Sequence, residues 1–101
     1  MIKEIKQIAE HYGYENQSFQ LIKEMAELTV AINHNRRNPS RENFKNLIEE
    51  IADVDLCLEQ IKYLLHAKEL VNIAIIGKIL RQLERIKAEE AEEAEEAEDK
   101  K

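Results

Sequence analysis

The apolar pattern between Leu47 and Leu65 constrains the fold more than any other part of this 101-residue sequence. Large apolar residues recur there at alternating steps of four and three, at Leu47, Ile51, Val54, Leu58, Ile61 and Leu65. This spacing lines one face of an α-helix, whereas a half-buried strand would alternate apolar and polar residues. A helix with one apolar face packs against other helices, so the pattern predicts an all-α protein.

The rest of the chain predicts three further helices. They cover about residues 2–11, 17–35 and 70–86, in addition to the helix at 41–65. Gly13 is expected to end the first helix, and the polar segment with the only proline separates the second from the third, where Ser40 is a candidate N-cap.

The expected apolar stripe of the second helix consists of Leu21, Met25, Leu28 and Ile32. Each of the four helices offers one such stripe. We therefore expect a helical bundle of about four helices, completed by oligomerisation into a homodimer or homotetramer.

The charge distribution divides the chain into residues 1–87 and an Ala/Glu-rich acidic tail at residues 88–101. The tail holds eight acids and two lysines, whereas the other 87 residues hold 13 acids and 13 bases. The predicted helical domain is therefore neutral and lacks the basic excess typical of nucleic-acid-binding proteins. The tail has no large apolar residue, so we expect it to be solvated and frayed, although Ala and Glu favour helix.

Several features predict a cytoplasmic protein that does not bind membranes. The single cysteine, Cys57, excludes an intrachain disulfide framework. No apolar run approaches the roughly 20 residues needed to span a bilayer. The N-terminal residues alternate charged and apolar side chains, unlike a secretory signal.

Two pairs of carboxylates lie beside the apolar stripes of the two central helices. Glu24 and Glu27 are one turn apart on one helix, and Glu50 and Asp53 are one turn apart on the next. All four are expected at boundary positions, and antiparallel packing would bring them together. Carboxylate oxygens are ligands that Mg²⁺ and Mn²⁺ prefer, and four unpaired carboxylates would repel. The alternative is a solvated acidic face, which is common in a chain with 21 acids.

The ordered set of motifs resembles the all-α nucleoside triphosphate pyrophosphohydrolases of the MazG-like family. The run KEMAEL carries ExxE, and the run EEIADV carries ExxD, with 22 residues between Glu27 and Glu50. The resemblance covers roughly residues 12–86, including the YGYENQ lead-in with Gln17 and a basic fourth helix with Lys78 and Arg85.

The resemblance implies Mg²⁺-dependent cleavage of a nucleoside triphosphate between the α and β phosphates, giving the monophosphate and pyrophosphate. It implies that Glu24, Glu27, Glu50 and Asp53 bind the metal and carry the catalysis, with Mn²⁺ as an alternative ion. Gln17, Lys78 and Arg85 are the expected substrate-binding residues. Such chemistry needs no Ser or Cys nucleophile, since a divalent cation can activate water.

One position departs from the family pattern. Members often open the first motif with two adjacent acids, and here the first of these is Lys23. A lysine there could change the number of ions or lower activity, or it could be a solvated surface residue. The alternative function is therefore a non-catalytic helical module that oligomerises or binds nucleotide or metal.

The cations Lys78 and Arg85 of the fourth helix also have an alternative role. They could pair with Glu84 or with a neighbouring subunit, in place of a substrate.

Overall fold

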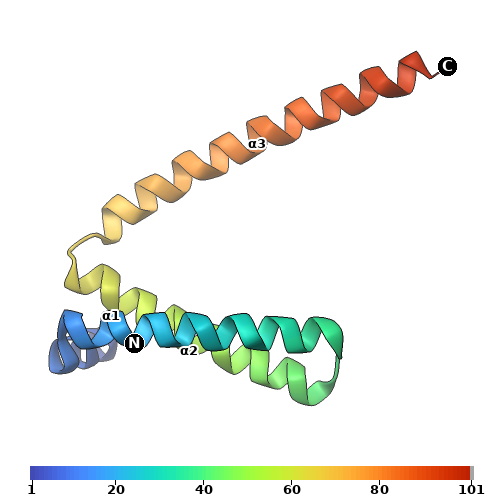
Figure 1. Cartoon of the computed structure of the whole chain (residues 1–101). Helices are drawn as coiled ribbons and strands as arrows, with labels where there is room; N and C mark the ends of the chain where they lie inside the picture. Colours follow the sequence, from blue (N-terminus) through green and yellow to red (C-terminus); the bar gives the residue numbers. More distant parts are fainter. Residues whose placement is uncertain (101) are drawn as a thin grey trace. The chain divides into compact units, whose positions relative to one another are not determined.

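The computed structural model describes residues 1–100, which form three α-helices. These are α1 (Ile2–Arg37), α2 (Arg41–Leu64) and α3 (Lys68–Asp99) (Figure 1). No strand occurs in residues 1–100, so the all-α prediction is confirmed. The chain divides into two compact units, the first ending at Lys68 and the second beginning at Glu69. No helix in the described residues is long and apolar enough to cross a membrane.

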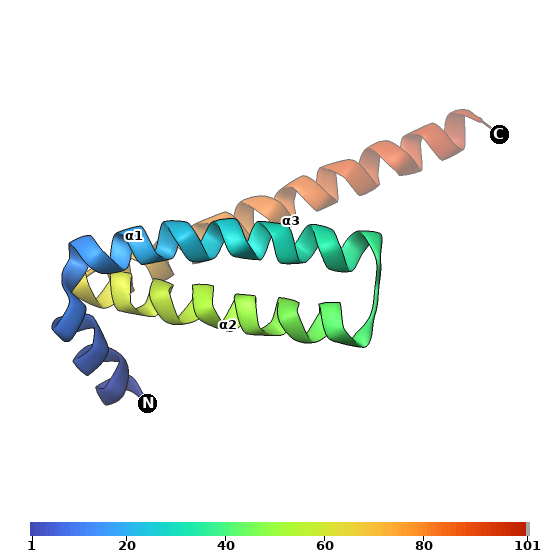
Figure 2. The ribbon, with the colours of Figure 1, turned by 60° about the horizontal axis from the view of Figure 1, so that its bottom comes forward.

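Helix α1 contains a kink at Gly13, where two separate helices were predicted. Gly13 has φ 83° and ψ 167°, a backbone conformation that only glycine adopts readily. The segment before Gly13 turns away from the rest of α1 (Figure 2). The predicted break is thus present as a kink without a loop. Three helices are formed, and the expected count of about four is not confirmed.

Alanine substitutions at the two glycines, Gly13 and Gly77, are expected to have opposite effects on stability. A Cβ at Gly13 would meet nothing within 4 Å, so Gly13→Ala is strained only through the backbone and should destabilise by about 1–3 kcal/mol. Gly77 lies inside α3 with equally open space, so Gly77→Ala should stabilise by about 0.5–1 kcal/mol. Urea unfolding of both variants measures the difference. Equal effects of the two substitutions would contradict the assigned backbone strain.

The N-terminal segment of α1 is attached to the end of α2 through Tyr63. The Tyr63 hydroxyl donates a hydrogen bond to the Glu10 carboxylate. The Lys6 ammonium lies 5.4 Å from the centre of the Tyr63 ring, within the range of a cation–π contact. Ala9, between these two contacts, is fully buried. The kink at Gly13 therefore directs the N-terminal segment onto the last turns of α2.

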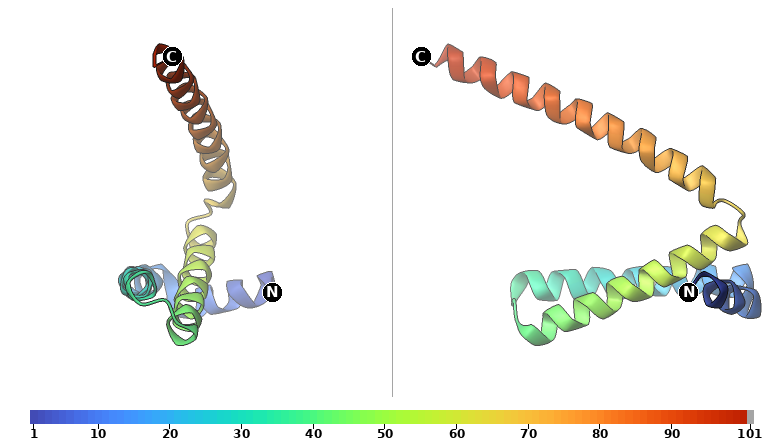
Figure 3. Two further views of the ribbon diagram at one scale, coloured as in Figure 1. Left: turned by 90° about the vertical axis from the view of Figure 1, so that its right-hand side faces the viewer. Right: turned by 180° about the vertical axis from the view of Figure 1, so that it is seen from behind.

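After the kink, α1 and α2 lie side by side as an antiparallel pair, which we call the hairpin (Figures 2 and 3). The Ser40 hydroxyl accepts a hydrogen bond from the backbone N–H of Asn43 at 3.0 Å, which confirms Ser40 as the N-cap of α2. The Asn43 side chain donates to the Asn38 carbonyl at 2.8 Å and stabilises the turn. A short, capped turn fixes the two helices as neighbours.

The line of α1 that faces α2 is more polar than predicted. Gln17, Glu24 and Ala31, spaced seven residues apart, are buried, whereas Met25 and Ile32 of the expected stripe are 44% and 46% exposed. On α2 the buried residues are Val54, Cys57 and Gln60. The helix is rotated so that the line through Glu24 contacts α2. Leu21 and Leu28 of the predicted stripe are half-buried beside that contact, and only Met25 and Ile32 are exposed.

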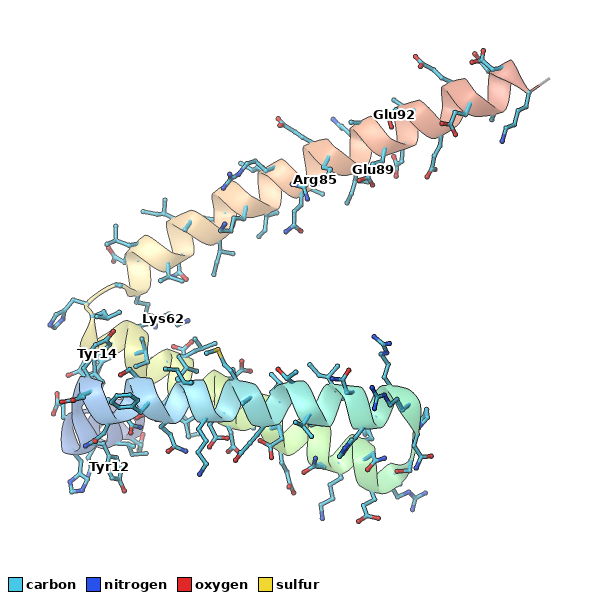
Figure 4. All side chains as sticks on the ribbon, in the orientation of Figure 1. Tyr12, Tyr14, Lys62, Arg85, Glu89 and Glu92 are labelled. Carbon is cyan, nitrogen blue, oxygen red and sulfur yellow. The ribbon has the colours of Figure 1, made fainter. Side chains whose placement is uncertain are left out.

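Helix α3 is continuous through residue 88, where the acidic tail was predicted to begin. The repeat of Ala and Glu is helical to Asp99, consistent with the high helix propensity of both residues. Residues 88–100 are exposed, as expected, but the helix continues to Asp99, so the expected fraying is not seen before that residue. Arg85, Glu89 and Glu92 extend away from the α3 ribbon (Figure 4).

Candidate metal centre

Three glutamates from the two hairpin helices meet at one point. One carboxylate oxygen from each of Glu24, Glu27 and Glu50 lies within 4.8 Å of the other two. The two helices run antiparallel, which places the middle of α1 beside the middle of α2. Three of the four predicted ligands are therefore brought together. Asp53, the fourth, is exposed and lies one turn further along α2.

Glu24 is buried in the contact between α1 and α2, which corrects its predicted boundary position. Its residue is only 7% exposed, and one carboxylate oxygen accepts a hydrogen bond from the Gln20 amide at 2.6 Å. The other oxygen, Oε2, is buried without a hydrogen-bond partner, as is Oε2 of Glu50. Buried polar atoms are normally paired, because leaving one unpaired is costly in free energy. Two such atoms lie in one cluster, and a proton, a water molecule or a cation can each satisfy them.

Burial and mutual repulsion perturb the acidity of the cluster. Burial raises the pKa of Glu24, the hydrogen bond from Gln20 opposes this, and the charges of Glu27 and Asp53 raise it further. Burial also raises the pKa of Glu50, again with contributions from Glu27 and Asp53. The ionised cluster is therefore unfavourable by itself and is stabilised by protons or by a cation.

The arrangement of the three glutamates fits a divalent cation. Oxygens that bind the same Mg²⁺ can be at most about 4.2 Å apart, twice the metal–oxygen bond length. Small side-chain movements would bring the three oxygens, now within 4.8 Å, into that range. The donors are hard carboxylate oxygens from a rigid helix pair, the type that Mg²⁺ and Mn²⁺ favour over softer metals. Asp53 lies close to the cluster, since its charge contributes to the raised pKa values of both Glu24 and Glu50.

The pKa shifts predict how the stability of the metal-free protein depends on pH. The folded chain takes up protons at Glu24 and Glu50 at higher pH than the unfolded chain, whose carboxyls titrate near 4.5. The contribution of these two carboxyls to the free energy of unfolding should therefore grow as the pH falls through the raised pKa values. It should become constant below pH 4.5.

Urea unfolding in EDTA between about pH 7 and pH 5 measures this contribution. The slope of unfolding free energy against pH should be more negative for the wild type than for the double variant Glu24→Gln/Glu50→Gln. Equal slopes would show that the two carboxyls do not carry the effect.

A groove of about 520 Å³ adjoins the cluster on the side of the kink. Its lining combines two carboxylates of the candidate site, four amides and a few apolar groups: Ile8, Tyr12, Asn16, Gln17, Gln20, Glu24, Asp53, Leu56, Cys57 and Gln60. We call it the amide groove. Gln17, predicted to bind substrate, lines it, but its amide donates to the buried Gln60 carbonyl at 2.6 Å.

The residues Asn16, Gln20 and Gln60 were missed as groove residues. Gln60 is only 2% exposed, but it lies outside the apolar stripe of α2, so the apolar pattern gave no signal for its burial. Burial of the Cys57 thiol and the nearby charges of Glu24 and Asp53 raise its pKa, so it remains a neutral thiol at the groove wall.

A second groove, of about 350 Å³, adjoins the cluster on the side of the hairpin turn. It is lined by Ala26, Glu27, Val30, Ala31, His34, Asn46 and Glu50. Glu24 and Asp53 line the amide groove, whereas Glu27 and Glu50 line this one. The carboxylates therefore lie between two hollows on one face of the hairpin.

The remaining predicted residues lie outside the cluster. Lys78 and Arg85 are exposed on α3, in the second unit, and their contact with substrate stays a prediction. Lys23 is exposed on α1 next to Glu24.

No protein-family model, curated protein or solved structure matches this chain.

Proposed function

We propose that this protein is a Mg²⁺-dependent nucleoside triphosphate pyrophosphohydrolase that cleaves between the α and β phosphates, with Mn²⁺ as an alternative ion. One observation carries the proposal: Glu24 and Glu50 each bury an unpartnered carboxylate oxygen in a cluster of three glutamates. The resemblance of the two motifs to MazG-like sequences supports the same assignment, and it supplies the reaction.

The residues that would hold the cation are Glu24, Glu27 and Glu50, joined by Asp53. When bound, a divalent cation neutralises charge on the phosphates and lowers the pKa of water, which makes hydrolysis possible near neutral pH. A carboxylate of this cluster that is free to accept a proton can act as the general base.

The amide groove is suited to the nucleoside. Its amides offer both hydrogen-bond donors and acceptors, as the edges of nucleobases do, and none of them carries a charge. Tyr12, at the groove wall and 53% exposed, presents an aromatic ring on which a base can stack. With the nucleoside in this groove, the phosphates extend over the carboxylate cluster. In this proposal Gln17 positions the groove wall through Gln60.

The test is a panel of canonical, deoxy and oxidised nucleoside triphosphates, incubated with Mg²⁺ or with EDTA. The proposal predicts pyrophosphate and nucleoside monophosphate as products, formed only with the cation. Release of inorganic phosphate and diphosphate would place the cleaved bond elsewhere. No turnover of any substrate by the folded protein would favour the alternative of a non-catalytic module.

A further inference from the structure

Positive charge is concentrated at the end of the hairpin where α1 turns into α2, remote from the kink (Figure 2). Residues 34–45 hold one acid, Glu42, and four cations: Arg36, Arg37, Arg41 and Lys45. The other residues up to residue 87 hold nine cations and twelve acids. Residues 1–87 are neutral in total, but the turn end of the hairpin is basic.

Local helix stability does not account for this charge. A positive side chain in the last turn of α1 is favourable, because the carboxyl end of a helix is the negative end of its dipole. Arg41, however, is the first residue of α2, where the dipole favours an acid. Within residues 1–100, none of the four cations forms a salt bridge. Their charges can therefore attract an anion from outside the chain.

Two of the cations lie on the side of the hairpin that carries the grooves. A helix repeats its direction after about seven residues, which is two turns, and after about eleven, which is three. Arg37 follows Val30 by two turns, and Val30 lines the second groove. Lys45 precedes Leu56 by three turns, and Leu56 lines the amide groove on the same face. Arg37 and Lys45 therefore flank the turn end of the second groove.

The second groove connects the carboxylates to this basic end. Glu27 and Glu50 line it, and His34 and Asn46 line it nearer the turn. His34 lies roughly 10 Å beyond Glu27 along α1, and Asn46 lies roughly 6 Å from Glu50 along α2, at 1.5 Å per residue. Imidazole and amide groups both donate hydrogen bonds, which phosphate oxygens accept. The groove thus has metal-binding groups at one end and donors with nearby cations at the other.

We propose that the turn end of the second groove binds a diphosphate group, namely the β and γ phosphates of a nucleotide and the pyrophosphate that its cleavage releases. With a divalent cation at the carboxylates to neutralise one phosphate, His34 and Asn46 donate to the other. Arg37 and Lys45 supply positive charge beside it, and arginine binds phosphate through paired, charge-assisted hydrogen bonds.

The site gives the substrate a direction along the hairpin. The nucleoside lies toward the kink in the amide groove, the α–β bond lies over the carboxylates, and the leaving group lies toward the turn. This direction rests on the proposed function. The binding of a diphosphate does not need turnover, so it can be tested separately.

The experiment is isothermal titration calorimetry of the full chain with inorganic pyrophosphate in excess Mg²⁺. The wild type should bind pyrophosphate, and Arg37→Gln/Lys45→Gln should bind it at least about tenfold more weakly, since charge-assisted hydrogen bonds are lost. Arg36→Gln is the matched control, because it makes the same change one residue earlier, on the side of α1 away from the grooves. Its affinity should stay within about twofold of the wild type.

A nucleoside monophosphate, the other product, is the second probe. It should bind the double variant within about twofold of the wild type, because it occupies the amide groove, and circular dichroism verifies that each variant is folded. The expected losses would establish the diphosphate site even if no triphosphate is hydrolysed. No binding of pyrophosphate by the wild type, or equal losses in Arg36→Gln and the double variant, would overturn the site even if hydrolysis occurs.

Discussion

Glu50→Gln is expected to lower the turnover of Mg²⁺-dependent nucleotide hydrolysis at least about 100-fold while the chain stays folded. Removing a residue that only orients a metal ligand costs 10–100-fold in affinity or activity, so removing a ligand charge should cost no less. Glutamine has nearly the shape of glutamate but lacks the negative charge. The buried Oε2 of Glu50, which has no partner, becomes a neutral group that is easier to bury. Glu24→Gln should act in the same way.

The matched control is Glu49→Gln, which makes the same chemical change one residue earlier, at an exposed position outside the three-glutamate cluster. Its turnover should stay within about twofold of the wild type. The test measures kcat and KM for all three variants, and circular dichroism verifies that each is folded. Unchanged turnover in Glu50→Gln and Glu24→Gln would mean that the catalytic site lies elsewhere.

The second large expected effect is a rise in melting temperature when Mg²⁺ is added. A ligand that binds only the folded state stabilises it by about 2.7 kcal/mol at one hundred times its dissociation constant. For a domain of this size each kcal/mol corresponds to roughly 4–8 °C, so a shift of about 10 °C or more is expected at saturation. The effect should be large because the metal-free cluster is repulsive and partly buried.

Two controls distinguish binding at the cluster from general screening of charge. The EDTA sample contains NaCl to the same ionic strength, because salt alone weakens repulsion among exposed acids. The double variant Glu24→Gln/Glu50→Gln should lose the shift and should also melt higher than the wild type in EDTA. An equal Mg²⁺ shift in the wild type and the double variant would assign the effect to other acids, such as those of α3.

The sequence is sufficient to predict the all-α class and the convergence of three of the four predicted carboxylates. Steps of three and four residues identify α2, Ser40 marks its start, and Gly13 marks the kink in α1. The turn between the helices is short, so they have to run antiparallel. Antiparallel packing places Glu24 and Glu27 beside Glu50, as predicted from spacing.

The rotation of α1 about its own axis could not be predicted. Apolar spacing selects Leu21, Met25, Leu28 and Ile32, whereas the line that contacts α2 runs through Gln17, Glu24 and Ala31. A polar line gives no hydrophobic signal, and the buried hydrogen bond between Gln17 and Gln60 joins residues 43 positions apart. Single-helix patterns contain no information about such a pair. For the same reason the burial of Glu24 was missed.

The length of α3 was underestimated for a different reason. Residues 88–99 lack large apolar side chains, so the pattern predicts nothing for them to pack against. Intrinsic helix propensity favours a helix even where side chains make no tertiary contacts, and Ala and Glu are both strong helix formers. The helix therefore continues to Asp99 while its side chains remain exposed.

The most direct test of the central claim is to locate a bound Mn²⁺ by NMR. Mn²⁺ is paramagnetic and broadens the signals of nearby amides in the ¹⁵N-labelled full chain. At substoichiometric Mn²⁺, the amides near Glu24 and Glu27 in α1, and near Glu50 in α2, are expected to broaden first. Amides of residues 88–99 should be affected only at higher Mn²⁺, and Glu24→Gln/Glu50→Gln should remove the early effect. Broadening that begins in the acidic repeat of α3 and leaves the hairpin unchanged would contradict the metal centre.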